Sequence, residues 1–288
     1  MVLERFSLEG RVAIVTGGGT GLGKAMCHAI AQAGADVAVA SRNPASIHET
    51  AEEVRSLGRR ALTVQTDITD SRQVDNLMRR TIEEFGHIDI LVNNAGIARG
   101  IEPSPRDPVP KPLPPIWEIS DEMWRRAIDT NLTGTFYCCR AVAKHMIDRG
   151  KGKVINIASL GGLRPARNLF TYCSAKAGVI MLTRVLAVTW ARQNIQVNSI
   201  APGVFANPEA AVANLHHQAK HNPMGRCGNP VEIGPMAVFL ASDAASYITG
   251  ECFILDGGRC ARYAPNGYAP VIELGRGPER EEAGCDAG

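Results

Sequence analysis

Short runs of β-branched or alanine residues alternate with longer segments of helical pattern along most of the chain. The runs lie at 12–16, 36–40, 61–65, 88–92, 153–158 and 196–200, and the helical segments at 23–33, 44–57, 71–85, 121–149, 170–192 and 230–240. Strands separated by helices in this order are typical of a parallel sheet with crossover helices. Because the runs do not alternate strictly between apolar and polar residues, we expect helices to cover both faces of the sheet.

Residues that favour helix ends support these boundaries. Ser71 and Asp121 are predicted N-caps, and glycines stand where four helices should end, at Gly34, Gly58, Gly86 and Gly150. The fold class predicted is therefore α/β, a single Rossmann-type doubly wound parallel sheet flanked by helices on both faces. With 288 residues, 45% of them hydrophobic, the chain can bury one large core, and we expect one domain over residues 1–258.

Two segments depart from the alternation. Seven prolines in 101–116 exclude both a helix and a central strand, so we expect a proline-rich surface loop inserted in the domain. Residues 259–288 become charged and glycine-rich after about Leu274, which predicts a C-terminal extension that is only partly ordered.

Composition excludes several classes of function. The formal charge is +2, from 31 basic and 29 acidic residues spread along the chain, so a nucleic-acid partner is not expected. The first ten residues lack the apolar core of a signal peptide, and we expect no segment to reach the roughly 18 apolar residues needed to span a bilayer. The eight cysteines include no C-x-x-C pair, so we expect reduced thiols and no metal site. A cytoplasmic protein without membrane association is predicted.

A glycine-rich segment directly follows the first predicted strand and directly precedes the first helix. A turn of this kind lets the backbone approach a pyrophosphate, whose charge is met by the helix N-terminus. The alternative is a tight turn without a ligand, but strand, turn and helix in this order favour a dinucleotide site. The predicted cofactor residues here are Gly17, Gly19, Thr20, Gly21, Leu22 and Gly23.

The end of the second predicted strand indicates which dinucleotide binds. A carboxylate there would favour NAD by accepting from the ribose 2′-hydroxyl, but this chain has Ser41 and Arg42. A hydroxyl and a guanidinium can both bind a 2′-phosphate, so NADP(H) is preferred and NAD(H) possible. The alternative is that Arg42 only stacks on the adenine or faces water.

Further cofactor residues are predicted at the ends of the next two strands. Asp67 is placed to accept from the adenine amino group and is followed by Ile68. Asn94, Ala95 and Gly96 follow the fourth strand, where small residues admit the cofactor.

A tyrosine and a lysine four residues apart, Tyr172 and Lys176, share one face of a predicted helix. An ammonium beside a phenol would lower the tyrosine pKa and make it a usable general acid or base. A lone pair of this kind is more often an ordinary surface pair, but position adds weight. Ser159 ends the fifth strand at the sheet edge where ligands bind, and its hydroxyl can polarise a carbonyl. Asn131 is an unusual residue for a helix interior.

These motifs, at 16–23, 93–96, Asn131, Ser159, Tyr172, Lys176 and Pro202-Gly203, have the order and spacing of the classical short-chain dehydrogenases/reductases, which the chain resembles over residues 8–258. The resemblance implies a catalytic tetrad of Asn131, Ser159, Tyr172 and Lys176. In it Tyr172 exchanges the proton, Ser159 holds the substrate oxygen, Lys176 also binds the nicotinamide ribose, and Asn131 supports a water relay. It also implies a homotetramer, or a homodimer, built on helices within 121–149 and 170–192.

The resemblance extends to the remaining contacts, with one departure. Pro202, Gly203 and Val204 are expected at the cofactor. Asn207 stands where the family usually has a threonine that binds the carboxamide, and it is predicted to bind there too, because an amide also donates. Predicted substrate contacts are Ser159, Tyr172, Gly161, Arg164 and Asn168. Arg164 and Arg167 could bind a carboxylate, although arginines in such loops are commonly solvated.

Three hypotheses follow for the activity. The leading one is an NADP(H)-dependent oxidoreductase that acts on a carbonyl or secondary alcohol of a sugar acid or polyol, because the segments 6–10 and 131–136 look most like gluconate 5-dehydrogenases. The second is a 3-oxoacyl thioester reductase acting on acyl carrier protein. The third, a dinucleotide-binding regulator without turnover, is disfavoured by the intact tetrad.

Overall fold

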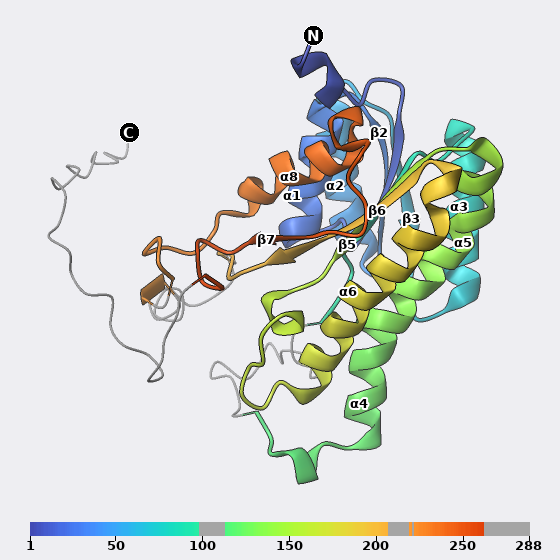
Figure 1. The fold of residues 1–288 in the computed structure, drawn as a ribbon. Helices are drawn as coiled ribbons and strands as arrows, with labels where there is room; N and C mark the ends of the chain where they lie inside the picture. Colours follow the sequence, from blue (N-terminus) through green and yellow to red (C-terminus); the bar gives the residue numbers. More distant parts are fainter. Residues whose placement is uncertain (98–112, 207–218, 221, 262–288) are drawn as a thin grey trace, which may run out of the picture.

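The computed structural model of the protein describes residues 1–97, 113–206, 219–220 and 222–261. A seven-stranded sheet lies at its centre, with the strand order β3-β2-β1-β4-β5-β6-β7 and every neighbouring pair parallel. The strands are β1 (Val12–Thr16), β2 (Asp36–Ser41), β3 (Ala61–Gln65), β4 (Ile90–Asn93), β5 (Gly152–Ile157), β6 (Ile195–Pro202) and β7 (Cys252–Leu255). The fold is therefore the predicted Rossmann-type sheet (Figure 1).

Helices cover both faces of this sheet (Figure 1). One face carries α1 (Gly21–Gln32), α2 (Pro44–Ser56) and α8 (Gly234–Ala241), and the other carries α3 (Ser71–Phe85), α5 (Gly134–Arg149) and α6 (Phe170–Trp190), with α4 (Asp121–Ile128) leading into α5. β1 lies between β2 and β4, so the direction of strand addition reverses beside it. In open parallel sheets ligands bind in the crevice at the carboxyl ends of the strands at this point.

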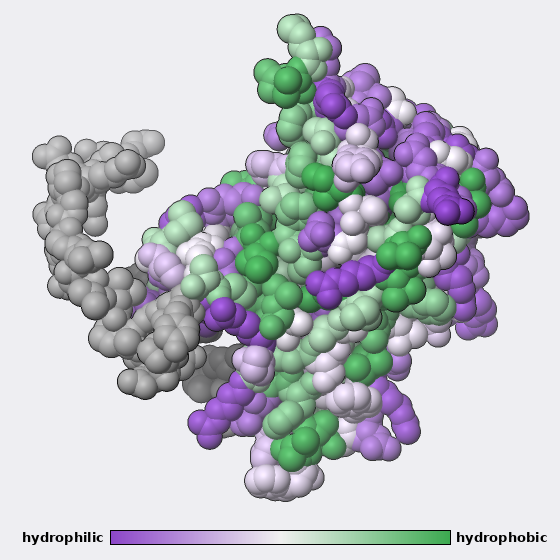
Figure 2. Space-filling view, in the orientation of Figure 1, coloured by the Kyte–Doolittle hydropathy of each residue, from purple (hydrophilic) through white to green (hydrophobic). Residues whose placement is uncertain are grey.

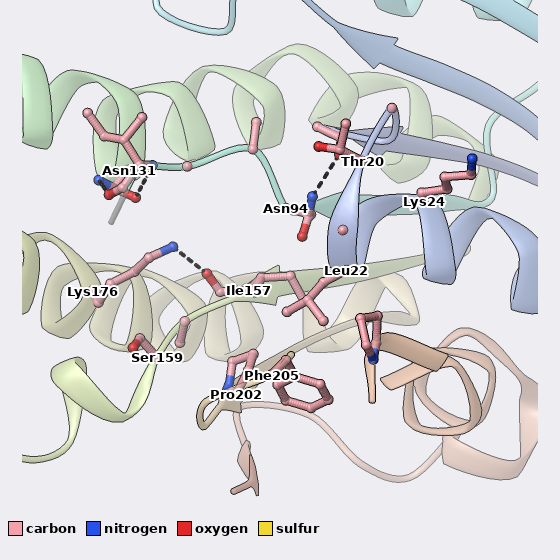
Figure 3. Close-up of a pocket in the computed structure, with 18 of the residues that line it drawn as sticks. Thr20, Leu22, Lys24, Asn94, Asn131, Ile157, Ser159, Lys176, Pro202 and Phe205 are labelled. Carbon is pink, nitrogen blue, oxygen red and sulfur yellow. Dashed lines mark hydrogen bonds between the residues drawn. The ribbon is translucent and has the colours of Figure 1, made fainter. Parts of the chain in front are cut away.

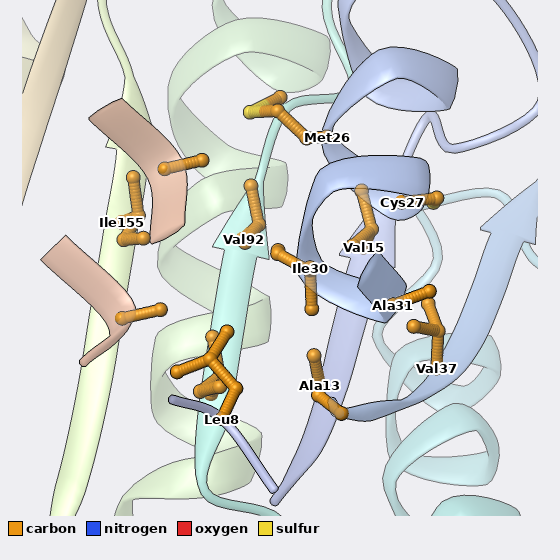
Figure 4. Close-up of a cluster of buried hydrophobic side chains, with 14 of the residues drawn as sticks. Leu8, Ala13, Val15, Met26, Cys27, Ile30, Ala31, Val37, Val92 and Ile155 are labelled. Atoms are coloured by element: carbon orange, nitrogen blue, oxygen red, sulfur yellow. The ribbon is translucent and has the colours of Figure 1, made fainter. Parts of the chain in front are cut away.

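Alternate residues of the central strands pack into two separate cores. In β1, Ala13 and Val15 face the α1 side (Figure 4), whereas Val12 and Ile14 face the side of α3 and α5. Each of these side chains is at most 2% exposed, and burial of a valine or isoleucine side chain contributes about 1.5–3 kcal/mol. This two-sided burial explains why the strand runs are apolar throughout.

Several predicted boundaries are wrong. The N-caps are Asp70 and Ser120, one residue before the predicted Ser71 and Asp121, and their side chains accept from the backbone of Arg72 and Met123. The predicted helix 121–149 is interrupted by a π-helical turn, Asp129–Thr133, and the predicted helix 230–240 begins as the 3₁₀ turn Pro230–Ile233 before α8.

β7 was not among the predicted runs because it is a four-residue, partly exposed strand at the edge of the sheet, defined by its pairing with β6. The predicted proline-rich loop lies largely outside the described residues, with only its last part, from Leu113, inside them. The predicted C-terminal extension is described only as far as Ala261.

α6 with the turn that follows it, Phe170–Gln193, is long and apolar enough to cross a membrane by length and composition alone. This finding corrects the expectation that no segment reaches that length. One side of the helix packs on the sheet through residues such as Val179, Thr183 and Ala187. Met181, Val185 and Val188 remain 56%, 54% and 83% exposed, and hydrophobic residues gather over α6 in Figure 2. Packing on the sheet accounts for only part of its apolar character.

Lys153, the second residue of β5, is 4% exposed, and within the described part of the chain its Nζ has no hydrogen-bond partner. Burial lowers its pKa to about 8, and nearby Arg11 adds to the shift while Asp243 opposes it. Below pH 8 the ammonium is therefore charged in the folded and the unfolded chain and destabilises the fold. Above pH 8 the folded chain loses this proton before the unfolded chain does, so the penalty disappears toward pH 10.5.

We therefore expect Lys153→Met to raise the free energy of unfolding at pH 7 by up to about 3 kcal/mol, since one pKa unit corresponds to roughly 1.4 kcal/mol. Thermal unfolding at pH 7 and pH 10 measures this, and the gain should shrink at the higher pH. Lys151→Met is the control, because Lys151 is half exposed and lies 3.4 Å from Asp89. An equal gain at both pH values would contradict the assigned cause.

Candidate active site

A cavity of about 860 Å³ opens at the carboxyl edge of the strands, where the order of strand addition reverses. Segments far apart in the sequence line it, namely the glycine turn after β1, the residues after β4, the end of β5, one face of α6 and the segment after β6. Figure 3 shows Asn131, Ser159 and Lys176 toward one end and Lys24 toward the other. A second cavity, of about 550 Å³, shares Gly17, Thr20, Ala95 and Gly96 with the first, so the two adjoin.

The glycine turn is held in a shape that side chains would block. Gly17 and Gly21 have φ values of +64° and +53°, in the left-handed region that favours glycine. A Cβ on Gly19 would overlap Ser46 Oγ, and one on Gly23 would overlap the carbonyl oxygen of Gly17. Gly17, Gly19, Gly21, Thr20 and Leu22 line the large cavity, whereas Gly23 lies behind the turn and permits the close packing of α1. The turn and the N-terminus of α1 together form a cradle suited to a pyrophosphate.

Asn94 joins the ends of β1 and β4. Its side-chain amide donates to the carbonyl oxygens of Thr16 and Gly17 at 3.0 and 3.1 Å, and Thr16 Oγ1 accepts from the backbone of Asn94 and Ala95 at 3.1 and 3.2 Å. Thr16 was not singled out by sequence, although its place as the last residue of β1 is a usable signal. The pair fixes the glycine turn relative to the small residues that line the cavity.

Asn131 lies in the π-helical turn between α4 and α5 and is fully buried. Its Nδ2 donates to the carbonyl oxygens of Ile97 and Ala127, both at 3.0 Å, and its Oδ1 accepts from the Ile97 N–H at 3.2 Å. Its side chain therefore joins the segment after β4 to the end of α4. The Cβ of any residue larger than glycine at position 96 would lie 2.7 Å from Asn131 Oδ1.

Ser159, Tyr172 and Lys176 meet at one end of the cavity. Lys176 is buried, and its Nζ donates to the Ile157 carbonyl oxygen at 2.7 Å (Figure 3). Burial lowers the pKa of Lys176 to about 8. Burial raises the pKa of Tyr172, and a hydrogen bond with Ser159 opposes this only in part.

The expected lowering of the Tyr172 pKa is thus wrong for this structure. The Lys176 ammonium is 5.9 Å from the centre of the Tyr172 ring and is hydrogen-bonded to the backbone of β5, so desolvation of the phenol dominates. A phenol with a raised pKa keeps its proton at neutral pH and can donate it to a developing alkoxide.

The second cavity contains the residues predicted for the adenosine half of a dinucleotide. Ser41, Arg42, Asp67 and Ile68 line it. The Ser41 hydroxyl also bonds locally, donating to the Asn43 carbonyl oxygen at 3.3 Å, and the Asp67 carboxylate accepts from the N–H and the hydroxyl of Thr69 at 2.9 and 2.8 Å. These contacts fix the side chains before any ligand binds.

The predicted substrate residues are only partly brought together. Ser159 and Tyr172 line the large cavity, whereas Gly161, Arg164 and Asn168 do not. Arg164 lies in the exposed segment after Ser159. Burial raises the pKa of Cys260, which lies near the C-terminal end of the described chain, and the charge of Arg164 opposes this rise. Asn168 has a φ of +61°, and its Nδ2 is 3.5 Å from the Leu113 carbonyl oxygen.

The segment after β6 contributes Pro202, Gly203, Phe205 and Ala206 to the large cavity, while Val204 faces a smaller one of about 100 Å³. Asn207 lies outside the described residues. Sequence reasoning missed Phe205 and Lys24, although both follow closely on motifs that it had identified. Among the described residues no group of three or more His, Cys, Asp or Glu side chains could hold a metal ion.

Comparisons with known proteins agree with this geometry. The family model described as short chain dehydrogenase matches residues 11–218. A 2-dehydro-3-deoxy-D-gluconate 5-dehydrogenase of Escherichia coli K12 is 40% identical over 268 residues, which cover 91% of this chain and all of the relative. A 3-oxoacyl-[acyl-carrier-protein] reductase of Synechocystis is 36% identical over 254 residues, covering 88% of this chain and 98% of the relative.

A solved structure extends the comparison to the fold. The crystal structure of a gluconate 5-dehydrogenase from Burkholderia cenocepacia J2315 in complex with NADP and tartrate superimposes with a TM-score of 0.82. That chain is 34% identical in sequence, and the match covers 91% of this chain and all of the other.

Proposed function

Since the chain belongs to the short-chain dehydrogenase family and is an oxidoreductase acting on CH–OH donors, we propose that it transfers a hydride between NADP(H) and a carbonyl or secondary alcohol of a sugar acid or polyol. The observation that carries this proposal is the convergence of Ser159, Tyr172 and Lys176 on one cavity with the glycine turn. The residues fit a dinucleotide, because Cβ atoms at positions 19 and 23 would fill or distort the cradle.

Bound at this cradle, the dinucleotide supplies the hydride donor or acceptor. The glycine turn and the N-terminus of α1 would hold its pyrophosphate, and the small residues Ala95 and Gly96 would leave room for it beside β4. Ser159 donates a hydrogen bond to the substrate oxygen and thereby orients it. Tyr172 gives its hydroxyl proton to that oxygen in reduction and accepts it in oxidation. Lys176 presents a cation at the base of the cavity, and Asn131 holds the wall formed by Ile97.

The choice of a sugar acid rests on the relatives. One relative is named for a dehydro-deoxygluconate, and the gluconate 5-dehydrogenase was solved with the dicarboxylate tartrate. A contact of Arg164 with the substrate carboxylate stays part of this proposal, although Arg164 is exposed and does not line the cavity in this structure. The second candidate, reduction of a 3-oxoacyl thioester, is favoured by the Synechocystis relative.

The experiment that tests the proposal follows the absorbance of reduced nicotinamide with NADPH and with NADH, against keto-sugar acids, simple ketones and a 3-oxoacyl thioester. We expect turnover of a keto-sugar acid with NADPH. Activity on the thioester alone would establish the second candidate, and dinucleotide binding without turnover of any of these substrates would favour the regulator.

The preference for NADPH is tested at Arg42, which lines the second cavity directly after β2. Loss of a charge-assisted contact to a 2′-phosphate costs about 1–3 kcal/mol, so Arg42→Ala should raise the dissociation constant of NADPH by about 5- to 150-fold. NADH affinity should change much less, and titration of both dinucleotides measures the difference. Equal losses for the two would remove the 2′-phosphate from the role of Arg42.

We further propose a cytoplasmic homotetramer, or a homodimer, in which the exposed apolar side chains of α6 are covered by a second copy of the chain. Met181, Val185 and Val188 support this, because a helix face of this kind is seldom left in water. Sedimentation analysis decides the point, since a species of 30.8 kDa would be a monomer.

A further inference from the structure

The second cavity has two arginines, and they come from different elements. Arg42 follows β2, whereas Arg126 belongs to α4. Asp129 and Thr130, in the π-helical turn after α4, also line this cavity. Among the described residues that line this cavity, these two side chains are the cations, and Asp67 and Asp129 are the carboxylates. The proposed hydride transfer gives Arg126 no task.

The helix directs Arg126 toward the cavity. Residues three and four positions apart share a helix face, which groups Arg126 with Asp129 and Thr130. Arg126 is half-buried, whereas the neighbouring Arg125 is 72% exposed and pairs with Asp121 at 3.4 Å. Two adjacent arginines on one helix thus have different surroundings, and only Arg126 lines the cavity.

The backbone that holds Arg126 is tied to the rest of the site. Asn131 Nδ2 donates to the carbonyl oxygen of Ala127, the next residue, and to that of Ile97, which borders both cavities. The backbone at Arg126 is therefore held relative to the wall of the cofactor site.

The charges of the cavity favour a ligand with both an anionic and a neutral polar part. Two guanidinium groups are opposed by two carboxylates, and the Asp67 carboxylate lies at the end of β3, beyond Arg42 at the end of β2. If the cavity bound only a phosphate, the two carboxylates would repel it and weaken its binding. A flat base with ring nitrogens and an amino group can accept from or stack on a guanidinium and also donate to a carboxylate.

We propose that Arg126 is a cofactor-binding residue that contacts the adenine base, while Arg42 binds at the ribose 2′ position. The inference rests on the proposed dinucleotide site and adds a contact to it. Arg126 then contributes equally to the affinity for NADPH and for NADH, and it contributes nothing to binding of the nicotinamide half. Substitutions of Arg42 and of Arg126 should therefore change dinucleotide affinity in different, measurable ways.

The test titrates the full-length protein with NADPH, NADH and reduced nicotinamide mononucleotide, comparing wild type with Arg126→Met and Arg126→Lys. We expect Arg126→Met to weaken binding of NADPH and of NADH by the same factor, about 5- to 30-fold. The affinity for the mononucleotide should not change. Arg126→Lys should lose most of the same affinity, because the ammonium keeps the charge but not the planar contact. Arg125→Met is the matched control and should bind both dinucleotides as the wild type does.

Four results would overturn the inference. A loss confined to NADPH would make Arg126 a second 2′-phosphate contact, and unchanged affinity for both dinucleotides would remove it from the site. Full rescue by lysine, or a loss that includes the mononucleotide, would mean that Arg126 acts only through charge or through the fold. Failure of the wild type to bind either dinucleotide would instead refute the proposed function, so the two failures are distinguishable.

Discussion

Tyr172→Phe is expected to lower kcat by a factor of about 10³ or more while dinucleotide affinity stays within about two-fold of wild type, since proton transfer by a positioned side chain contributes 10² to 10⁴. The substitution removes one hydroxyl and keeps the ring that lines the cavity. Because burial raises the pKa of Tyr172, this hydroxyl holds its proton at neutral pH and is a suitable donor to the substrate oxygen. No other phenol lines this cavity in the described part of the chain.

The measurement is kcat for the carbonyl substrate that wild type reduces, together with a dinucleotide titration of the same preparation. Tyr247→Phe is the control, since the Tyr247 side chain is fully exposed and should lose its hydroxyl without effect. Turnover by Tyr172→Phe within ten-fold of wild type would exclude Tyr172 as the proton donor. Loss of dinucleotide binding in this variant would point instead to a role in shaping the site.

Gly23→Ala is expected to weaken dinucleotide binding by about 100-fold or more and to lower the unfolding temperature. The added Cβ would overlap the carbonyl oxygen of Gly17 and lie about 2.5 Å from the Asn94 amide nitrogen. Backbone atoms cannot turn away as a flexible side chain can, so α1 must move or the contacts of Asn94 must break. Overpacking in a closely packed region costs roughly 1–3 kcal/mol or more, and here the strain falls on the pyrophosphate cradle.

Thermal unfolding and titration with NADPH and NADH measure the two effects separately. Gly150→Ala is a matched control, because Gly150 has a φ of +63° and no atoms within 4 Å of an added Cβ. It should cost about 1–2 kcal/mol of stability for the left-handed backbone and leave dinucleotide binding unchanged. Wild-type binding by Gly23→Ala would show that the contact of α1 with the glycine turn is not needed.

Local sequence patterns were sufficient to predict an element where its residues share the same environment along the whole segment. β1 has the predicted bounds, since a strand in the interior of a parallel sheet is covered on both faces and selects apolar residues throughout. β3 also has the predicted bounds, although it is a partly exposed strand at the edge of the sheet. The glycine turn was equally clear, because a strand, a left-handed turn and a helix N-terminus each leave a local signature. The edge strand β7 leaves a weak one, since its pairing with β6 defines it.

Contacts between distant segments decided the rest. The interruption of the predicted helix 121–149 at Asp129–Thr133 accompanies the bonds of Asn131 to Ile97, 34 residues away. Arg125 and Arg126 look alike in sequence, but only Arg126 lines the second cavity, beside residues from distant segments. Whether Arg164 and Asn168 contact a substrate stays a prediction, because neither lines the cavity.

By itself the sequence determined the class of fold, six of the seven strands, and the residue types at the glycine turn and at the predicted catalytic cluster, because short-range sterics and burial leave a trace along each segment. The tertiary structure alone decided the direction of the pKa shifts and the surroundings of each charged group. Spacing placed Lys176 near Tyr172, but depth of burial and the carbonyl oxygen of Ile157 determine what each side chain does. Desolvation depends on every segment packed around a group, and no local pattern records it.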